Sequence, residues 1–354
     1  MKKRVLVAMS GGVDSAVCAY LIKKEQMDVE GITMRLWSGD ENIPDSKDTV
    51  PDKNCTDAML ICSRLGIPHR SVALGESFRE KIVDKFISDY ICGLTPNPCV
   101  ECNKHIKFGA LMKAALDEGF DHLATGHYAR IEKQGNEYLI KKAFDEKKDQ
   151  TYFLWSIKKE YLPHILFPLG DKTKDEIRAI ARENNFENAE RSDSQDICFI
   201  ENGDYSSFIR KETNYLFPSG DFISPGGKVL GKHTGIINYT IGQRKGLGVA
   251  LGRPIFVSKK DTVNNTVTLC DDKELFTRTL TAHSVNLLTD IDLSPPTPLT
   301  AKIRYRHTPA SAVVQLLTDG RLTVEFEEPQ RAITPGQSVV LYDGDILVGG
   351  GIIE

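Results

Sequence analysis

Apolar positions in the first two hundred residues follow two alternating spacings. Short β-branched runs predict strands, and stretches in which apolar residues recur every three or four positions predict the helices between them. In chain order, the predicted elements cover residues 4–9, 14–24, 29–36, 55–65, 70–74, 76–92, 107–118 and 122–124, with a polar, mobile loop predicted over 38–53. Strands that alternate with helices predict an α/β fold with a doubly wound parallel sheet, which binds ligands at the carboxyl ends of its strands.

The pattern changes after about residue 200, where glycine and proline become frequent and helical spacing fades. The β segments expected there are 228–230, 235–239, 255–258 and 266–270, then, at regular spacing, 299–304, 312–317, 322–326 and 338–342. Turn pairs such as Asp319-Gly320 separate the later segments, as is typical of a small antiparallel barrel. Three domains are therefore predicted: a nucleotide-binding parallel-sheet domain (1–200), a small central mixed or β domain (201–275) and a C-terminal antiparallel β-barrel (276–354).

Composition limits the classes of protein that fit this pattern. The 354 residues include 45 Lys and Arg against 49 Asp and Glu, so the net charge of −4 does not itself indicate a nucleic-acid partner, although it does not exclude a local basic stripe. The eight cysteines are few for this length and do not form a disulfide framework. No apolar run approaches the roughly 18 residues that span a bilayer, and we expect a cytoplasmic protein with no membrane partner.

A glycine-rich string, Ser10-Gly11-Gly12-Val13-Asp14-Ser15, joins the first predicted strand to the first predicted helix. The two glycines let the backbone approach phosphate oxygens, and the helix N-terminus adds free N–H groups and the positive end of its dipole. The string lacks the Lys-Ser/Thr pair of a P-loop and the spacing of a dinucleotide fingerprint. A glycine turn capped by Asp14 or Ser15 is the structural alternative, but the strand–turn–helix context favours a phosphate site.

The same string resembles the pyrophosphate loop of the ATP pyrophosphatases, which split ATP between the α and β phosphates and adenylate a carbonyl oxygen. The resemblance implies ATP with Mg²⁺ as the cofactor. The ATP-binding residues that it implies are Ala8, Met9, Ser10, Gly11, Gly12, Val13, Asp14, Ser15, Met34 and Gly126. The loop alone does not choose among the members, which include GMP synthetase, NAD synthetase and the tRNA thiolation enzymes.

Three cysteines lie outside the apolar stretches that hold the other five. Cys99 and Cys102 follow a proline-rich stretch at the start of a helical pattern, and Cys198 lies nearly a hundred residues later. A cysteine at a helix start beside Lys104 is expected to have a lowered pKa and a larger thiolate fraction. Two structural alternatives are half of a zinc site, for which no second close pair follows at the required spacing, and a packed thiol at Cys198 between apolar neighbours.

Longer stretches resemble the tRNA-specific 2-thiouridylase family over essentially the whole chain. The matching stretches are 95–104, 106–109, 125–128, 148–154, 193–199, 239–248, 304–306, 335–337 and 342–345. The resemblance implies ATP-dependent 2-thiolation of the wobble uridine in lysine, glutamate and glutamine tRNAs: the C2 oxygen is adenylated, sulfur replaces it, and AMP and pyrophosphate are released. Residues 1–200 would be the ATP pyrophosphatase domain and 276–354 the tRNA-contacting barrel.

The resemblance also implies how sulfur is carried. Cys198 would hold a persulfide received from a cysteine desulfurase or a sulfur-carrier protein, and Cys102 would attack it, leaving a Cys102–Cys198 disulfide. The family commonly has an Asp, a proposed acid/base, where this chain has Cys99, and a thiol is a poorer proton acceptor than a carboxylate. Two alternatives remain open: a [4Fe-4S] cluster on Cys99, Cys102 and Cys198 as the sulfur carrier, and another ligase with the same loop, for which the chain shows no ammonia source.

The remaining site residues are implied by the resemblance as contacts to RNA. Asn97, Pro98 and Cys99 would line the flipped target base. The implied tRNA contacts are His127, Lys148, Asp149, Gln150, Arg304, Tyr305, Arg306 and Gln337. An Arg-Tyr-Arg string alone is typical of a solvated strand face, but its guanidinium and aromatic groups suit the bases of an anticodon loop. We expect a monomer, since tRNA engagement by three domains needs no second copy.

Overall fold

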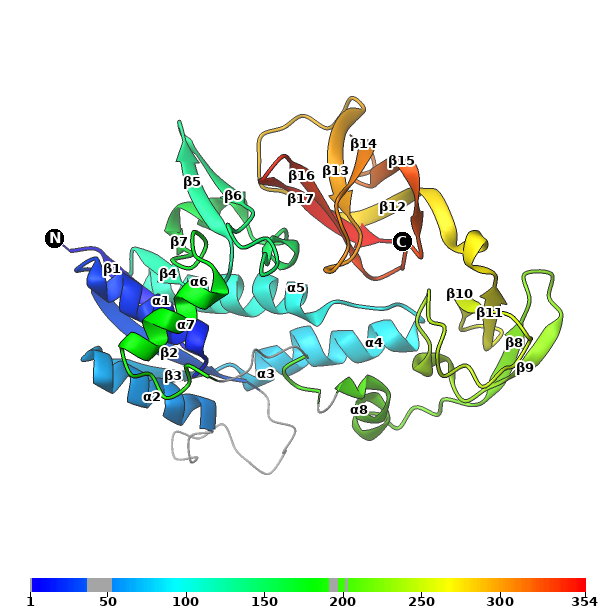
Figure 1. Ribbon diagram of the computed structural model, residues 1–354, viewed down its shortest axis with the longest axis horizontal. Helices are drawn as coiled ribbons and strands as arrows, with labels where there is room; N and C mark the ends of the chain where they lie inside the picture. Colours follow the sequence, from blue (N-terminus) through cyan, green and yellow to red (C-terminus); the bar gives the residue numbers. More distant parts are fainter. Residues whose placement is uncertain (1, 37–52, 191–196, 201–202) are drawn as a thin grey trace.

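The computed structural model describes residues 2–36, 53–190, 197–200 and 203–354 (Figure 1). The predicted loop over 38–53 lies outside these residues apart from Lys53, which begins a helix, and so do residues 193–196 of the stretch before Cys198. No helix in the described ranges is both long and apolar enough to cross a membrane.

A five-stranded parallel sheet forms the N-terminal domain, with strand order β3-β2-β1-β4-β7. Its strands are β1 (Arg4–Ala8), β2 (Asp28–Arg35), β3 (His69–Ala73), β4 (His122–Ala124) and β7 (Ile165–Leu166). Its longer helices are α1 (Val13–Lys24), α2 (Lys53–Leu65), α7 (Lys174–Glu183) and two compound helices, α3-η1-α4 (Gly75–Phe78, Arg79–Asp84, Lys85–Ile91) and α5-η2-α6 (Pro98–Cys102, Asn103–Leu111, Met112–Asp117). The predicted doubly wound α/β architecture is confirmed, and the strand order reverses between β1 and β4, which is where such sheets bind ligands.

Strand β1 is buried on both faces, which explains its continuous apolar sequence. Val5 and Val7 pack on one face with side chains of α1 and α2. Leu6, on the opposite face, belongs to a cluster with Phe108 of the η2 segment and with Trp155. The sheet is therefore covered on both sides, and the loop that follows β1 lies between the two layers of helices.

The central domain contains a four-stranded mixed sheet with order β10-β11-β8-β9, preceded by α8 (Tyr205–Glu212). Its strands are β8 (Gly220–Ile223), β9 (Val229–His233), β10 (Phe256–Asp261) and β11 (Thr266–Cys270), with β11 and β8 parallel. The predicted strand over 235–239 is wrong, because Ile236–Asn238 forms a short 3₁₀ turn. Gly235 enters that turn at φ +117°, and the Asn238 amide donates to the Thr234 carbonyl at 3.0 Å, which holds the chain in a turn.

The C-terminal domain is a closed antiparallel barrel of six strands, as predicted, in the order β12-β15-β14-β13-β16-β17 with β12 paired to β17. The strands are β12 (Phe276–Leu287), β13 (Thr297–Lys302), β14 (Ala310–Leu316), β15 (Leu322–Arg331), β16 (Ser338–Asp343) and β17 (Ile346–Ile353). A hairpin of the N-terminal domain, β5 (Arg130–Gln134) and β6 (Glu137–Lys141), pairs through β6 with β17. The barrel sheet therefore continues into the N-terminal domain.

Trp155 fixes the barrel against the N-terminal domain. Its indole is buried, and its Nε1 donates to the Ser338 hydroxyl at 3.0 Å. The Tyr152 hydroxyl donates to the Ser338 carbonyl at 3.0 Å, and the Asn286 amide donates to the Trp155 carbonyl at 2.6 Å. The ring lies so close to Gly350 that a Cβ there would be 2.9 Å from it. The two domains thus share one core, and they are expected to unfold together.

This contact predicts that Gly350→Ala destabilises the protein. The added methyl group would lie 2.6 Å from the Val339 carbonyl oxygen and 2.9 Å from the Trp155 ring, so β17 must shift. We expect a loss of about 2 kcal/mol in the free energy of unfolding, measured by urea denaturation. Gly226→Ala is the matched control, because its nearest neighbour would be a side-chain atom at 3.9 Å. Equal unfolding midpoints for the two variants would contradict the close packing.

Candidate active site

The glycine loop after β1 has the form of a phosphate site. Gly11 takes φ +72°, and a Cβ there would lie 2.6 Å from the Asn54 carbonyl oxygen, so only glycine fits. The Ser15 hydroxyl accepts from the Ser10 amide at 3.2 Å and donates to the Gly12 carbonyl at 3.0 Å. Gly12 is the N-cap of α1, and no side chain of the described residues caps the helix. The capped-turn alternative is therefore not what is observed, and the first amides of α1 remain available to an anion.

Asp14 organises this loop. Its carboxylate accepts from the Lys174 ammonium at 2.8 and 2.9 Å and from the Tyr128 hydroxyl at 2.8 Å. Lys174 is buried and lies 5.6 Å from the centre of the Tyr128 ring. Because the charge of Asp14 is already paired inside the protein, its geometry fits a structural role in the loop, and Mg²⁺ would be held mainly by the phosphates of ATP.

The other residues expected to bind ATP lie at the same edge of the sheet. Ala8 ends β1, Met34 is half-buried next to the end of β2, and Gly126 follows β4. A Cβ at Gly126 would lie 2.9 Å from the backbone carbonyl carbon of Asp14, so this glycine lets β4 approach the start of α1. The Met9 amide donates to a β2 carbonyl, and its side chain is buried beneath the loop, as is that of Val13.

Cys99 and Cys102 lie on the first turns of the continuous α5-η2-α6 helix. Asn97 caps this helix, since its side-chain oxygen accepts from the Cys99 amide at 3.2 Å, and Pro98 occupies the first helical position. Cys102 is buried, and Cys99 is exposed one turn earlier on the same side. The wider π-type turns that follow over Asn103–Leu111 are a feature frequent at functional sites.

Cys198 is carried to the other two thiols by a turn that aromatic packing anchors. The Ile200 amide donates to the Ile197 carbonyl at 3.0 Å, and the Phe199 ring meets the Phe78 and Phe86 rings edge-on at 5.7 and 5.5 Å. Cys198 as a whole residue is exposed, while neighbouring groups partly enclose its sulfur atom. Cys198 lies within electrostatic reach of the two helix cysteines. The structure therefore brings the three cysteines together.

The predicted lowering of the thiol pKa is wrong. Burial raises the pKa of Cys102 and of Cys99, and burial together with the neighbouring thiols raises that of Cys198 to about 12. The positive charge that opposes this effect at all three thiols is Lys107, whereas Lys104 acts on Glu101. The prediction relied on Lys104 because it is close to Cys102 in sequence. In the structure Lys104 is exposed, whereas Lys107 is half-buried.

The carboxylate of Glu101 does not replace the Asp that is common at position 99. It lies 3.3 Å from His105 on the same helix. Although burial works against it, the hydrogen bond from His105 and the charges of Lys85 and Lys104 lower the pKa of Glu101. The group is therefore an ionised, paired carboxylate, unlike a general acid/base held near neutrality.

His127 connects this cysteine cluster to β4. Its Nδ1 lies 2.7 Å from the Thr125 hydroxyl, and its Nε2 lies 3.4 Å from the Lys107 ammonium. Burial, followed by the Lys107 charge, holds the pKa of His127 well below its usual range. The ring is therefore neutral, with Nε2 accepting from Lys107 and Nδ1–H donating to Thr125. Sequence reasoning assigned His127 to tRNA, but both ring nitrogens face protein groups here.

The turn over 148–150 is built largely from internal hydrogen bonds. The Asp149 carboxylate accepts from the Ala143 amide at 3.0 Å and from the Thr151 hydroxyl at 2.7 Å. The Gln150 side-chain oxygen accepts from the Tyr128 amide at 2.9 Å. Lys148 is half-buried next to them. Asp149 and Gln150 thus hold the turn against the segment that contacts Asp14.

The barrel contributes a group of cations next to the cysteine helix. Lys302, Arg304 and Arg306, named here the barrel cation group, have no carboxylate within ion-pair distance among the described residues. Tyr305 stands among them, with its ring 4.4 Å from the Phe153 ring and 5.5 Å from the Lys302 ammonium. Lys302 was missed by sequence reasoning, although its i, i+2, i+4 spacing with the two arginines was visible.

Both accessory domains hold the loop that leads to Cys99. The Gln337 amide of the barrel donates to the Thr95 carbonyl at 2.7 Å, and the Thr95 amide donates to the Pro335 carbonyl at 3.0 Å. From the central domain, the Lys260 ammonium donates to the Leu94 carbonyl at 3.4 Å. Figure 1 shows α4 and this loop reaching from the parallel sheet toward both domains. In this structure Gln337, assigned to tRNA from sequence, bonds to the cysteine-bearing loop.

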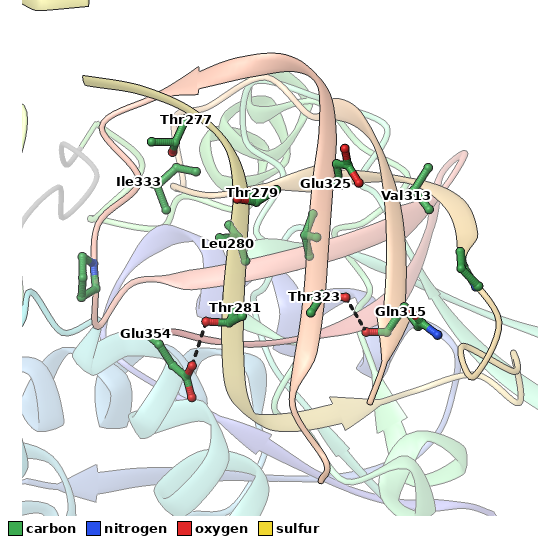
Figure 2. Close-up of a pocket in the computed structure, with 13 residues that line it drawn as sticks. Thr277, Thr279, Leu280, Thr281, Val313, Gln315, Thr323, Glu325, Ile333 and Glu354 are labelled. Carbon is green, nitrogen blue, oxygen red and sulfur yellow. Dashed lines mark hydrogen bonds between the residues drawn. The ribbon is translucent and has the colours of Figure 1, made fainter. Parts of the chain in front are cut away.

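A hollow of about 570 Å³ lies elsewhere, on the barrel (Figure 2). Its lining is Thr277, Thr279, Leu280, Thr281, Pro296, Val313, Gln315, Thr323, Val324, Glu325, Ile333, Pro335 and Glu354. The Thr281 hydroxyl donates to the Glu354 carboxylate at 2.7 Å, and the Thr323 hydroxyl donates to the Gln315 carbonyl at 3.3 Å. The lining contains two carboxylates, and no cysteine, histidine, lysine or arginine is among its residues. It therefore offers neither a thiol for sulfur chemistry nor positive charge for RNA.

The cysteine cluster also bears on metal binding. No three His, Cys, Asp or Glu side chains of the described residues are placed to hold one metal ion together. The thiolates of a [4Fe-4S] cluster bind separate iron atoms, so this finding concerns single ions, and the cluster on Cys99, Cys102 and Cys198 stays a prediction.

Comparisons with known proteins cover the whole chain. Family models described as the tRNA methyl transferase HUP domain, the tRNA methyl transferase PRC-barrel domain and the aminomethyltransferase beta-barrel domain match residues 3–202, 206–271 and 277–353. The tRNA-specific 2-thiouridylase MnmA of Clostridioides difficile (strain 630) is 46% identical over 356 residues, which cover 100% of this chain and 99% of that protein. The chain belongs to the tRNA-specific 2-thiouridylase family.

Another relative and a solved structure complete the comparison. The tRNA-specific 2-thiouridylase MnmA of Clostridium beijerinckii (strain ATCC 51743 / NCIMB 8052) is 47% identical over 356 residues, covering 100% of this chain and 99% of that protein. A 4-thiouridine synthetase–RNA complex with bound ATP is 17% identical with a TM-score of 0.35, covering 59% of this chain and 50% of that one. The full-length 2-thiouridylase relatives confirm the family and the enzyme class predicted from sequence.

The bonds from the barrel predict that Gln337→Leu loosens the loop before Cys99. Without the amide, the Thr95 carbonyl loses its donor, and the segment over 92–97 opens more often. We expect hydrogen–deuterium exchange of a peptide covering 92–97 to quicken by about tenfold. Gln315→Leu is the control, because that amide donates to Ser294 within the barrel. Unchanged exchange in Gln337→Leu would show that the side chain does not restrain the loop.

Proposed function

We propose that this chain thiolates the wobble uridine of lysine, glutamate and glutamine tRNAs at C2, using ATP and releasing AMP and pyrophosphate. One observation carries the proposal: a four-residue segment after β4, Thr125-Gly126-His127-Tyr128, contacts both the phosphate loop and the helix that carries Cys99 and Cys102. Gly126 and Tyr128 meet Asp14, and His127 meets Lys107. The reaction needs the α-phosphate to reach the C2 oxygen and the sulfur to reach the C2 carbon, so the two sites must lie close together, and the contacts of this segment support that.

The phosphate loop would perform the first half of the reaction. The C2 oxygen of uridine is a poor leaving group, so it attacks the α-phosphorus of ATP, and pyrophosphate departs. The uncapped amides of α1 and the Ser10 hydroxyl are placed to hold phosphate oxygens at the carboxyl end of β1. Adenylation converts the C2 oxygen into part of AMP, which sulfur can displace.

The cysteine cluster would perform the second half. Cys198, exposed on its turn, accepts a terminal sulfur atom from a cysteine desulfurase or a sulfur carrier and becomes a persulfide. That sulfur is delivered to C2 and displaces AMP, while Cys102 attacks the inner sulfur of Cys198 and closes a disulfide. The two thiols supply the two electrons that reduce the transferred sulfur, and an external thiol must reduce the disulfide before the next turnover.

The barrel cation group supports tRNA as the partner. Three cations without carboxylate partners, interleaved with the Tyr305 ring, offer charge for phosphates and a face for base stacking. The group lies next to the cysteine helix, because Tyr305 packs on Phe153, whose carbonyl accepts from the Asn103 amide at 2.9 Å. A single copy of the chain presents all these surfaces, and a monomer is part of the proposal.

The test of the proposal uses purified protein, unmodified glutamate tRNA, ATP, Mg²⁺ and a persulfide or sulfide donor. We expect AMP and 2-thiouridine in the unaltered protein. Cys102→Ser and Cys198→Ser should lose 2-thiouridine by at least about a hundredfold with a persulfide donor while still releasing pyrophosphate and forming the adenylated tRNA, because AMP leaves only when sulfur displaces it. Cys99→Ser should keep most of the activity, since Cys99 is outside the persulfide route.

Three outcomes of this assay would contradict parts of the proposal. Absence of both AMP and 2-thiouridine rejects the function. Loss of iron, colour and activity together in Cys99→Ser would favour the [4Fe-4S] alternative over the persulfide route. AMP formation that depends on ammonia and not on sulfur would favour another ligase of the superfamily.

A separate prediction concerns the phosphate loop. Asp14→Asn removes the charge that pairs with buried Lys174, so the ammonium is left without its counter-charge beside the start of α1, although the amide oxygen can still accept from Tyr128. We expect AMP formation to fall by at least about tenfold, with tRNA binding retained in a filter assay. Asp28→Asn, at an exposed strand start, is the control. Normal AMP formation in Asp14→Asn would place the nucleotide site elsewhere.

A further inference from the structure

One cation of the helix that carries Cys99 and Cys102 is turned toward the buried ring of His127. Lys107 lies in the η2 segment, a little over one turn after Cys102, and is half-buried. Lys104, one turn before it, is exposed. Neither residue was assigned a role from sequence beyond the expectation, now corrected, that Lys104 would act on the cysteines. The inward position of Lys107 needs a reason, since a lysine is more stable in water.

His127 holds Lys107 in place. The neutral imidazole presents an Nε2 lone pair 3.4 Å from the ammonium, and the Thr125 hydroxyl on the other side of the ring fixes that tautomer. His127 is buried between the Phe108 and Phe167 rings, with centroids 5.9 Å from each. The acceptor is thus a rigid, uncharged group that orients the ammonium without neutralising it. A carboxylate at this place would cancel the positive charge.

Lys107 is the cation that acts on the thiols within the described part of the chain. Among the described residues, the charged and titratable groups that act on Cys99, Cys102 and Cys198 are Lys107 and the thiols themselves. Lys107 favours the ionised form of each thiol, and each thiol that ionises disfavours the others. Among these residues, one cation therefore acts on three sulfur atoms.

We propose that Lys107, oriented by neutral His127, is the positioning residue that stabilises the sulfur anion in this cluster and limits it to one negative charge at a time. The inference rests on the proposed sulfur transfer and deepens it. A thiolate or persulfide anion next to Lys107 is the nucleophile, and its proton leaves to solvent through the exposed side of Cys99 and Cys198.

The experiment measures thiolate formation without tRNA, ATP or a sulfur donor. Full-length protein is alkylated with iodoacetamide at pH 8, and the rates at Cys99 and Cys198 are followed by peptide mass spectrometry. At a pH below the pKa of a thiol, the alkylation rate is proportional to the thiolate fraction, so one unit of pKa appears as about tenfold in rate. Exposed Cys92 is the internal reference.

Two neutral variants separate charge from hydrogen bonding. Lys107→Met removes both, and Lys107→Gln keeps an N–H donor for His127. We expect both variants to slow alkylation of Cys99 and Cys198 by about tenfold and to leave Cys92 unchanged, because an opposite charge at short range shifts a pKa by about one unit or more. Lys107→Arg should retain near-normal rates, and Lys104→Met is the matched control on the exposed side of the helix.

The outcomes distinguish this inference from the proposed function. Unchanged alkylation in Lys107→Met or Lys107→Gln overturns the inference, even where the thiolation assay succeeds. Slowed alkylation in a protein that never forms 2-thiouridine keeps the inference and overturns the function. In the thiolation assay, Lys107→Met should lower the kcat for 2-thiouridine by about tenfold, with the KM for ATP and the first-turnover release of pyrophosphate unchanged; a fall in pyrophosphate release instead would assign Lys107 to the phosphate site.

Discussion

The short backbone segment after β4 is the constraint on which the site depends. Strand β4 has only three residues, and the chain leaves it at the point where the strand order reverses. Gly126 can touch the start of α1 only because it lacks a side chain, and the neighbouring His127 then points to the cysteine helix. A bulkier residue at 126 would separate the phosphate loop from the thiols. In the proposed reaction, the proximity of ATP and the sulfur would thus depend on this one glycine contact.

The central domain and the barrel help to position Cys99 and Cys102, because both domains bond to the loop that precedes these residues. The loop before Cys99 receives hydrogen bonds from the barrel at Thr95 and from the central domain at Leu94. The barrel is itself fixed to the parallel sheet by the buried indole of Trp155 and by the β6–β17 pairing. A substrate that binds the barrel therefore contacts the same rigid body that holds the helix of Cys102. This coupling gives a physical reason for three domains in one chain.

Much of the fold could be predicted from sequence, and the exceptions share a cause. The alternating strands and helices, the doubly wound sheet and the barrel follow from local periodicity. Strand β17 was missed because Gly349, Gly350 and Gly351 are typical of a loop, whereas here the absent side chains make room for Trp155 and for β12. Lys107 was missed for the same reason: its importance depends on His127, which is distant in sequence. Contacts between distant segments leave little trace in a local pattern.

The charge balance of the cysteine cluster explains how the thiols can resist oxidation and still take part in the proposed sulfur transfer. Burial outweighs the attraction of Lys107, so the pKa values of all three thiols lie above their usual range and the resting cluster is protonated at neutral pH. Protonated thiols react slowly with oxidants, which would protect a site whose proposed chemistry ends in a disulfide. A persulfide is more acidic than a thiol, so sulfur loading itself would supply the anion that Lys107 pairs with. Neutral His127 leaves that positive charge free, and the cluster then gains its reactive charge only when it carries the sulfur to be transferred.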